Sequence, residues 1–299
     1  MNSPLVVVTG ANGLVGSRVC AALTERGARV RAIVRRPGTA PGGTDEVVGD
    51  FHDPDIAARA CEGATAVVNT VHPMSDDQEH LQATAVGWAA TLASAARDAG
   101  VERFVHTSTT GVYRRESDTG DVDEDSPLVD DDANAYAVTK RDTDAALAEV
   151  DGLTRVIVRP TAILGAGETS VWNTLRPAQI GGDDVAGRTD DPTRTFGWVH
   201  VDDLAALLAD LATGRIALAD DPGRGPVEGE LTIANAVSGN VRIRDYLEPI
   251  AEALGVEPVW EQRGGFTQKL LAERARTWGW QPRVTFQQAM DELLAGLPR

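Results

Sequence analysis

The sequence is poor in cysteine, with only Cys20 and Cys61 among 299 residues. Two cysteines, one in the first expected helix and one near a helix end, are too few for a disulfide framework, so we expect both to be reduced. The five histidines are scattered without the spacing of metal ligands. The sequence therefore predicts no metal site.

Basic residues and long apolar runs are also scarce. The chain has 28 Lys and Arg against 45 Asp and Glu, a net charge of −17. Such an excess of negative charge repels nucleic acid and anionic membranes, so we expect neither as a partner. No apolar run reaches transmembrane length, and the N-terminus lacks the regions of a signal peptide. We therefore expect a cytoplasmic protein of one large or two coupled domains.

A β-branched run near the N-terminus leads through a glycine-rich turn into a helix. Residues 6–9 precede Gly10, Gly13 and Gly16, and an apolar helical pattern follows. In a dinucleotide-binding corner these glycines permit the turn, the approach of a pyrophosphate, and close packing of the helix, whose N–H groups face the anion. The alternative is a purely structural turn. We expect the cofactor to contact Gly10, Asn12, Gly13, Leu14, Val15 and Gly16.

The second expected strand, residues 28–34, ends at a basic pair, Arg35 and Arg36. In a dinucleotide-binding fold an acidic residue at this place accepts a hydrogen bond from the 2′-hydroxyl of NAD. An arginine there can instead pair with a 2′-phosphate, so Arg35 favours NADP over NAD. NAD remains possible, and the alternative for the arginines is a solvated basic loop.

Further strands should bring their carboxyl ends to the same crevice. Residues 47–51 indicate a third strand, residues 64–71 a fourth, and residues 101–106 a fifth that ends in the hydroxyl cluster 107–110. We expect cofactor contacts from Asp50 near the adenine amino group and from Phe51, Asn69, Thr70 and Val71. His72, just beyond the fourth strand, is interpreted as a loop residue rather than a catalyst.

Two expected helices follow on either side of an acidic stretch. Residues 79–99 are rich in alanine, which suits an inner packing face or a subunit interface, and residues 116–132 should form a solvated loop. Tyr136 and Lys140 then lie four residues apart on one helical face. After the glycine turn and the hydroxyl cluster, this pair completes a hydride-transfer site, with an incidental helical pair as the alternative.

Together these motifs resemble the extended short-chain dehydrogenase/reductase family, also called the NAD-dependent epimerase/dehydratase family. The resemblance covers most of the chain and rests on Thr9-Gly10-x-x-Gly13-x-x-Gly16, the cluster 107–113, Tyr136-x-x-x-Lys140, Arg159-Pro160 after a sixth strand, and the segment 199–205. It implies an α/β fold, a Rossmann doubly wound parallel sheet with a smaller, interleaved C-terminal substrate domain. We expect residues 1–165 and about 198–220 to bind the dinucleotide, and about 166–197 and 221–299 to bind substrate.

The resemblance also implies roles for individual side chains. Tyr136 would exchange a proton with a substrate oxygen, Lys140 would lower the tyrosine pKa and hold the nicotinamide ribose, and Thr109 would bond the same oxygen, with Ser108 as the alternate. Hydride would pass between nicotinamide and substrate carbon. Thr107 and Pro160 complete the expected cofactor contacts. The implied assembly is a homodimer formed by helix 79–99 and the Tyr-Lys helix.

Two positions depart from the members that bind nucleotide sugars. Phe196 stands where they carry an arginine four residues before His200, and Ala85 stands where they carry an asparagine, although Arg188 or Arg194 could substitute for the arginine. We therefore expect an NADP(H)-dependent oxidoreductase of a small carbonyl or alcohol. The alternatives are a nucleotide-sugar epimerase, dehydratase or ketoreductase, and a non-catalytic NADP-binding redox sensor. No pattern identifies the substrate.

Overall fold

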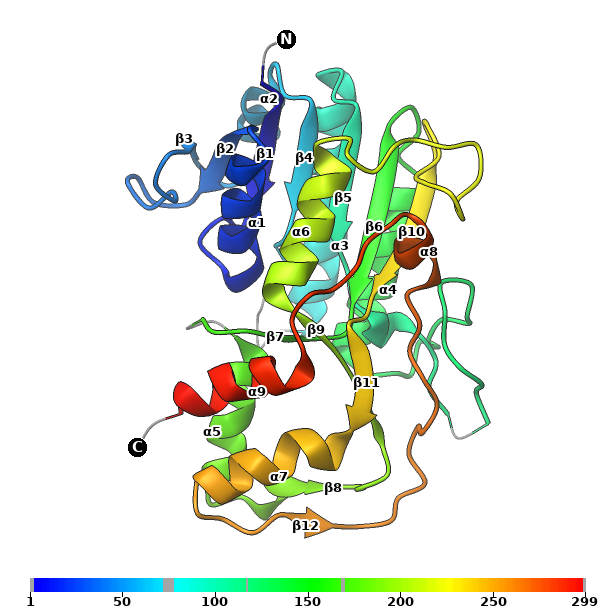
Figure 1. Cartoon of the computed structure of the whole chain (residues 1–299). Coiled ribbons are helices and arrows are strands. Elements are labelled where there is room, and N and C mark those ends of the chain that lie inside the picture. Colours follow the sequence, from blue (N-terminus) through cyan, green and yellow to red (C-terminus); the bar gives the residue numbers. More distant parts are fainter. Residues whose placement is uncertain (1–2, 72–77, 117, 168–169, 298–299) are drawn as a thin grey trace.

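The computed structural model describes residues 3–71, 78–116, 118–167 and 170–297. Its main feature is a parallel sheet of seven strands in the order β10-β6-β5-β4-β1-β2-β3 (Figure 1). The strands are β1 (Leu5–Thr9), β2 (Arg29–Val34), β3 (Asp45–Val48), β4 (Ala66–Asn69), β5 (Arg103–Thr107), β6 (Thr154–Pro160) and β10 (Leu231–Ala236). The strand order reverses at β1, which creates the crevice where doubly wound sheets bind ligands and confirms the expected Rossmann fold.

Helices cover both faces of this sheet, which explains why its inner strands read as continuous β-branched runs. On one face α1 (Leu14–Glu25) and α6 (Val201–Ala212) share a core in which Val19, Leu23 and Leu204 are buried. On the other face lie α2 (Pro54–Cys61), α3 (Gln78–Asp98) and α4 (Ala135–Ala148), with Leu92 and Leu147 in a second core (Figure 1).

A smaller group of elements lies beyond the carboxyl edge of the large sheet (Figure 1). It contains a three-stranded sheet in the order β11-β9-β7 and a two-stranded sheet of β12 and β8. The elements are β7 (Ala162–Leu164), η2 (Val171–Leu175), α5 (Arg176–Gly181), η3 (Val185–Arg188), β8 (Thr189–Asp190), β9 (Thr195–His200), β11 (Gly239–Arg242), α7 (Ile243–Ala253), β12 (Val259–Trp260) and α9 (Phe286–Ala295). They enclose a third core around Phe196, Trp198 and Tyr246. The residue boundaries of two domains stay a prediction.

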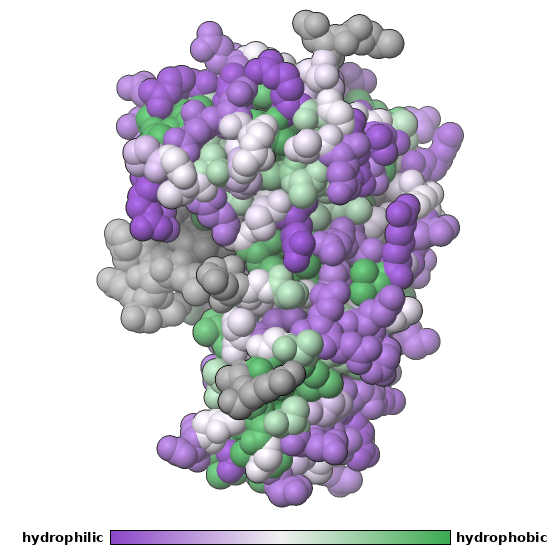
Figure 2. Space-filling view, turned by 60° about the vertical axis from the view of Figure 1, so that its left-hand side comes forward, coloured by the Kyte–Doolittle hydropathy of each residue, from purple (hydrophilic) through white to green (hydrophobic). Residues whose placement is uncertain are grey.

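Some large apolar side chains reach the surface, whereas both cysteines are buried. Figure 2 shows that hydrophobic residues gather on the lower part of the face in view. The exposed large apolar side chains include Val171, Leu175 and Val185, which belong to the smaller group of elements. Cys20 and Cys61 are buried and free, and burial raises the pKa of their thiols to about 12 and about 11. Among the described residues no helix is both long and apolar enough to cross a membrane.

Three expectations about local structure were wrong. The third strand ends at Val48, because Gly49 takes a φ of 152° and turns the chain, so Asp50 lies in a turn before α2. Pro160 and its predecessor belong to β6 instead of following it. In the acidic loop, which was expected to be solvated, Glu124 is buried. Its Oε1 accepts a hydrogen bond from the backbone N–H of Asn235 at 2.9 Å.

Candidate active site

The glycine turn after β1 is fixed by contacts that leave no room for side chains. Gly10 has a φ of +66°, and its carbonyl oxygen accepts a hydrogen bond from the Gly13 N–H at 2.8 Å. A Cβ on Gly16 would lie 2.0 Å from that same oxygen, and one on Gly10 would lie 2.7 Å from Thr70 Oγ1. The turn is therefore a backbone cradle that only glycine allows.

The N-terminus of α1 fits an anionic ligand. No side chain caps its first N–H groups, and no acidic residue lies in its first turn. Uncapped N–H groups and the helix dipole favour a phosphate at this position. Asn12 Nδ2 donates to Thr39 Oγ1 at 3.1 Å, Leu14 approaches Gly167, and Val15 packs against the core. The expected dinucleotide residues are thus brought together.

The ends of β1 and β4 are joined by a buried side chain at the crevice. Asn69 Oδ1 accepts from Thr9 Oγ1 at 2.6 Å, and Asn69 Nδ2 lies 3.1 Å from His106 Nδ1. Thr70 Oγ1 donates to the Thr9 carbonyl oxygen at 2.8 Å, and the Val71 N–H donates to Asn69 Oδ1 at 3.3 Å. Asn69 therefore orders this edge, while His72 lies outside the described residues.

Arg35 lies exposed at the carboxyl end of β2. No carboxylate of the described residues lies within 4.0 Å of its guanidinium, and its position is open to an anion. Nearby, Asp50 Oδ1 lies 2.8 Å from His52 Nδ1, and Phe51 is buried with its ring edge against His52. Burial lowers the pKa of His52 to about 4, opposed by Asp50 and reinforced by the positive charge of Arg35.

Thr109 and Tyr136 lie next to each other beside Gly111. Thr109 Oγ1 accepts from the Gly111 N–H at 3.0 Å, and a Cβ on Gly111 would lie 3.3 Å from that oxygen and 3.9 Å from Tyr136 Cε1. The Tyr136 side chain is 47% exposed, although surrounding protein raises its pKa and the hydrogen bond from Thr109 lowers it. Ser108, the alternate, is buried and faces Asp144 instead.

Lys140 lies one helical turn beyond Tyr136 and is buried, with 4% of its surface exposed. Its Nζ donates to the carbonyl oxygen of Thr107 at 3.0 Å, which ties α4 to the end of β5. Burial lowers the pKa of Lys140 to about 8, and the carboxylate of Asp144 opposes the shift. Pro160 closes the same edge, because its carbonyl oxygen accepts from Thr110 Oγ1 at 3.3 Å.

A buried polar chain behind Lys140 was missed by sequence reasoning. Asp144 Oδ2 accepts from Arg159 Nε at 3.0 Å, and that guanidinium lies over the Tyr113 ring at 4.9 Å from its centroid. Tyr113 donates in turn to Asn235 Oδ1 at 2.9 Å. A signal for it existed, because Arg159 follows a buried β-branched run and a buried charge requires a partner.

On the substrate side, Phe196 is part of an aromatic cluster. Its ring stacks on Tyr246 with centroids 4.7 Å apart and meets Trp172 edge-on at 5.1 Å. Phe196 is 3% exposed and enclosed by these rings. Of the two expected substitutes, Arg188 donates to the Gly182 carbonyl oxygen at 2.8 Å, and Arg194 is paired with Asp190 at 2.8 and 2.6 Å. The side chain of Ala85 lies outside the described residues.

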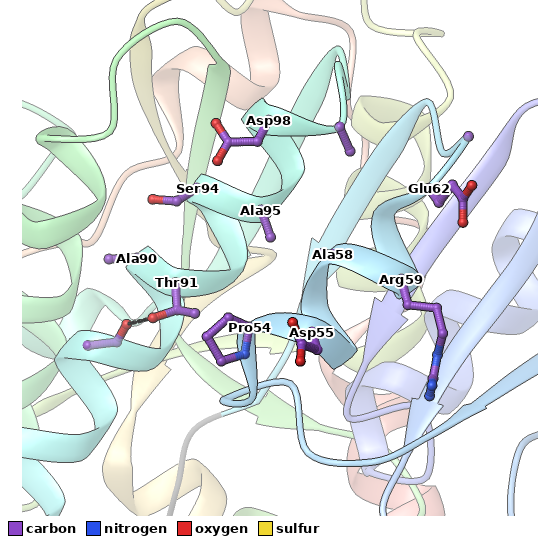
Figure 3. Close-up of a pocket in the computed structure, with 13 residues that line it drawn as sticks. Pro54, Asp55, Ala58, Arg59, Glu62, Ala90, Thr91, Ser94, Ala95 and Asp98 are labelled. Carbon is purple, nitrogen blue, oxygen red and sulfur yellow. Dashed lines mark hydrogen bonds between the residues drawn. The ribbon is translucent and has the colours of Figure 1, made fainter.

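A groove on the outer surface of α2 and α3 is separate from this site (Figure 3). It is lined by small and charged side chains, and Thr91 Oγ1 donates within its own helix to the Gly87 carbonyl oxygen at 2.9 Å. None of its lining residues belongs to the glycine turn, to α4 or to the segment 107–113. Within the described part of the chain, no cluster of three or more His, Cys, Asp or Glu side chains is placed to hold a metal ion.

Comparisons with known proteins match most of the chain to one family. The profile of the NAD dependent epimerase/dehydratase family matches residues 6–215. The chain is 33% identical over 184 residues to a 3 beta-hydroxysteroid dehydrogenase/Delta 5-->4-isomerase of Mycobacterium tuberculosis. The matched segment covers 57% of this chain but only 50% of that protein. It is 29% identical over 210 residues to the epimerase family protein SDR39U1 of Homo sapiens, covering 68% of each.

A solved structure extends the likeness to nearly the whole chain. The crystal structure of the Bordetella bronchiseptica enzyme WbmG, in complex with NAD and UDP, superposes with a TM-score of 0.74 over 98% of this chain and 94% of that one. At 20% identity this likeness shows the fold. The matched proteins include ones named as a dehydrogenase, a reductase and an epimerase.

Proposed function

The chain belongs to the NAD-dependent epimerase/dehydratase family, and from this premise we propose that it is an NADP(H)-dependent oxidoreductase acting on the carbonyl or alcohol of a small substrate. The observation that carries the proposal is the placement of Thr109 and Tyr136 around Gly111, with Lys140 buried one turn behind them. Two hydroxyl groups and an amine near the carboxyl end of β5 support proton exchange with a substrate oxygen.

The chain's own residues would divide the work as follows. Tyr136 exchanges a proton with the substrate oxygen, and Thr109 holds that oxygen in line with the tyrosine hydroxyl. The positive charge of Lys140 stabilises the phenolate form and holds the nicotinamide ribose. When bound, the nicotinamide supplies or accepts the hydride, so that a carbonyl, NADPH and one proton interconvert with an alcohol and NADP⁺.

NADP is proposed over NAD because of Arg35. Its guanidinium is exposed at the end of β2, where the ribose 2′-position of a dinucleotide lies in this fold. A 2′-phosphate would give Arg35 a charge-assisted partner, whereas a 2′-hydroxyl would not. The cofactor contacts proposed in the turn and at the ends of β3, β4 and β5 belong to the same hypothesis.

Two other functions are weighed against this one. A nucleotide-sugar epimerase, dehydratase or ketoreductase is favoured by the UDP in the WbmG structure, but Phe196 is enclosed by aromatic rings where such enzymes carry an arginine. A redox sensor that binds NADP without turnover has no use for a tyrosine and a threonine placed around one glycine. The buried, free cysteines also fit the proposed cytoplasmic location.

A homodimer through α3 and α4 is part of the proposal. Ala89, Ala93 and Ala96 pack into the core, so the alanine-rich helix turns only part of its small side chains outward. The outward ridge includes Gly87, Thr91 and Ser94, whose small size would allow close approach of a second helix pair. A monomeric mass by light scattering at micromolar concentration would exclude this assembly.

The test of the proposed function is Tyr136→Phe. This variant keeps the ring and its packing but removes the group that exchanges the proton, so turnover should fall by about 10²–10⁴-fold while NADPH affinity stays nearly unchanged. Nicotinamide absorbance with ketones, aldehydes and 4-keto nucleotide sugars measures the turnover, and fluorescence of bound NADPH measures the affinity. Near wild-type turnover by the variant would show that Tyr136 and Lys140 are an incidental pair.

A further inference from the structure

Lys140 and Asp144 lie one turn apart on the same face of α4, and each side chain is only 4% exposed. Residues four apart in a helix have Cβ atoms about 5–6 Å from each other, so the amine and the carboxylate are neighbours. The proposed chemistry needs only the lysine. The buried carboxylate beside it therefore requires an explanation of its own, because burying a charge is costly unless the charge is paired.

A closed ring of contacts joins these two side chains to the ends of two strands. Lys140 Nζ donates to the Thr107 carbonyl oxygen at 3.0 Å at the end of β5. The N–H of the next residue, Ser108, donates at 2.8 Å to the carbonyl oxygen of the β6 residue before Arg159. Arg159 Nε then donates to Asp144 Oδ2 at 3.0 Å. The ring runs from α4 to β5, to β6 and back, so the position of Asp144 is tied to that of Lys140.

The Asp144 carboxylate has one oxygen that Arg159 does not use. Oδ2 accepts from Arg159, whereas Oδ1 is buried and has no hydrogen-bond donor within the described residues. An ionised carboxylate accepts at both oxygens, and the ammonium group of Lys140 has three N–H groups, of which one is used at Thr107. Two cations therefore share one carboxylate, and the buried cluster keeps an excess of positive charge.

We propose that Asp144 is a positioning residue for the reaction, whose carboxylate keeps the Lys140 amine charged and fixed at the Thr107 carbonyl oxygen. Burial lowers the pKa of Lys140 to about 8, and the Asp144 carboxylate opposes this shift. Burial also raises the pKa of Asp144, and the guanidinium of Arg159 opposes that shift and favours the ionised carboxylate. The phenolate and the ribose both need the charged amine, so this inference rests on the proposed function of Lys140.

The other titratable groups on the elements packed against α4 have partners of their own. Among the described side chains they include His106 on β5, which contacts Asn69, Arg97 and Asp98 on α3, which pair with each other, Arg155 on β6, which donates to the last carbonyl oxygens of α4, and Tyr113, which donates to Asn235. Burial raises the pKa of Tyr113 and of Tyr136, so neither is charged near pH 8. Asp144 is thus the charged neighbour that acts on Lys140.

The chain has only two lysines, Lys140 and the exposed Lys269, which permits a direct measurement. With carbon-13-labelled lysine, an NMR titration of the Cε signals follows each amine in the cofactor-free protein. We expect Asp144→Asn to lower the pKa of Lys140 by at least about one unit, and Arg159→Gln to raise it, because the carboxylate is then no longer shared. Both variants break the same ion pair, so a purely structural role would not move the pKa in opposite directions.

Cofactor binding should follow the same shift. At pH 8 Asp144→Asn should bind NADPH at least about fivefold more weakly than the wild-type protein, and at pH 6 the two should agree within about twofold, because the amine is protonated in both. Asp144→Glu keeps the charge and should keep the wild-type profile. Asp142→Asn is the matched control, since it removes the same charge from a carboxylate on the same helix that is paired with Arg141, and it should leave the profile unchanged.

An unmoved pKa of Lys140 in Asp144→Asn, or equal shifts in the Asp142 and Asp144 variants, would overturn the inference. If only one of the Asp144→Asn and Arg159→Gln variants folds, the direction of its shift decides. A wild-type Lys140 that is already uncharged at pH 7 would overturn the inference without any variant. Opposite shifts without turnover of any carbonyl would refute only the proposed function, whereas Tyr136-dependent turnover with an unmoved pKa would refute only the role of Asp144.

Discussion

The glycine turn and the buried polar chain behind Lys140 both belong to the candidate site, yet they are built on different principles. In the turn the ligand-facing groups are backbone N–H groups, and the glycines are fixed by atoms of the backbone itself, as the 2.0 Å approach to Gly10 oxygen shows. In the polar chain the groups are side chains from different elements, since Asp144 accepts from Arg159 Nε and Tyr113 donates to Asn235 Oδ1. The backbone turn tolerates no change of shape, whereas the polar chain depends on each buried side chain keeping its partner.

The largest effect expected from this contrast concerns two glycines. In Gly16→Ala the new methyl group would meet the Gly10 carbonyl oxygen, which cannot move without opening the turn. We therefore expect the free energy of unfolding to fall by about 3 kcal/mol and NADPH binding to be lost. Gly265→Ala would meet only the Arg194 side chain at 3.4 Å, and its stability should change by less than about 1 kcal/mol. Chemical denaturation of both variants makes the measurement.

The two glycine variants also test where function resides. Gly265→Ala should keep full NADPH affinity, because the added methyl group meets only the Arg194 side chain. If Gly16→Ala folds with normal stability and binds NADPH, the turn is more plastic than its contacts indicate, and the distinction drawn between the turn and the polar chain fails.

An effect of intermediate size is expected at Arg35, the side chain proposed to distinguish NADP from NAD. Arg35→Ala should weaken NADPH binding roughly tenfold or more, since a charge-assisted bond to phosphate contributes about 1.5–3 kcal/mol. NADH binding should change little, and Arg36→Ala provides the neighbouring control. Equal losses for NADPH and NADH, measured by fluorescence titration, would mean that Arg35 contributes only general charge.

Sequence patterns predicted the glycine turn better than the buried polar chain behind Lys140. The Gly10-Gly13-Gly16 spacing and the four-residue interval between Tyr136 and Lys140 report local geometry, and the strand order follows from the family's fold. The buried chain from Asp144 through Arg159 and Tyr113 to Asn235 depends on how segments distant in sequence meet, and no periodicity encodes that.

The errors have the same physical origin. The third strand was extended too far because Gly49 was read as part of a run, while its backbone takes a positive φ. Glu124 was assigned to solvent with its acidic neighbours, but Asn235, more than a hundred residues away, supplies its buried N–H partner. In both cases the local composition was read correctly. The backbone conformation of Gly49 and the partner of Glu124 cannot be deduced from composition.

The smallest expected effect concerns Lys140, whose folded-state pKa of about 8 lies below its ordinary 10.5 because of burial. Between these values the unfolded chain binds the proton more strongly than the folded one, so the stability of the cofactor-free protein should rise with pH across this window. Cofactor binding should respond with the opposite sign, because the ribose contact and the tyrosine both require the charged amine. We expect NADPH affinity to be level below pH 8 and to fall above it, by no more than about tenfold per pH unit. Lys140→Met should flatten this part of both profiles, and Met at the exposed Lys269, the chain's other lysine, should leave them unchanged. An affinity that stays level from pH 7 to 10 in the wild-type protein would show that the amine of Lys140 does not act through its charge.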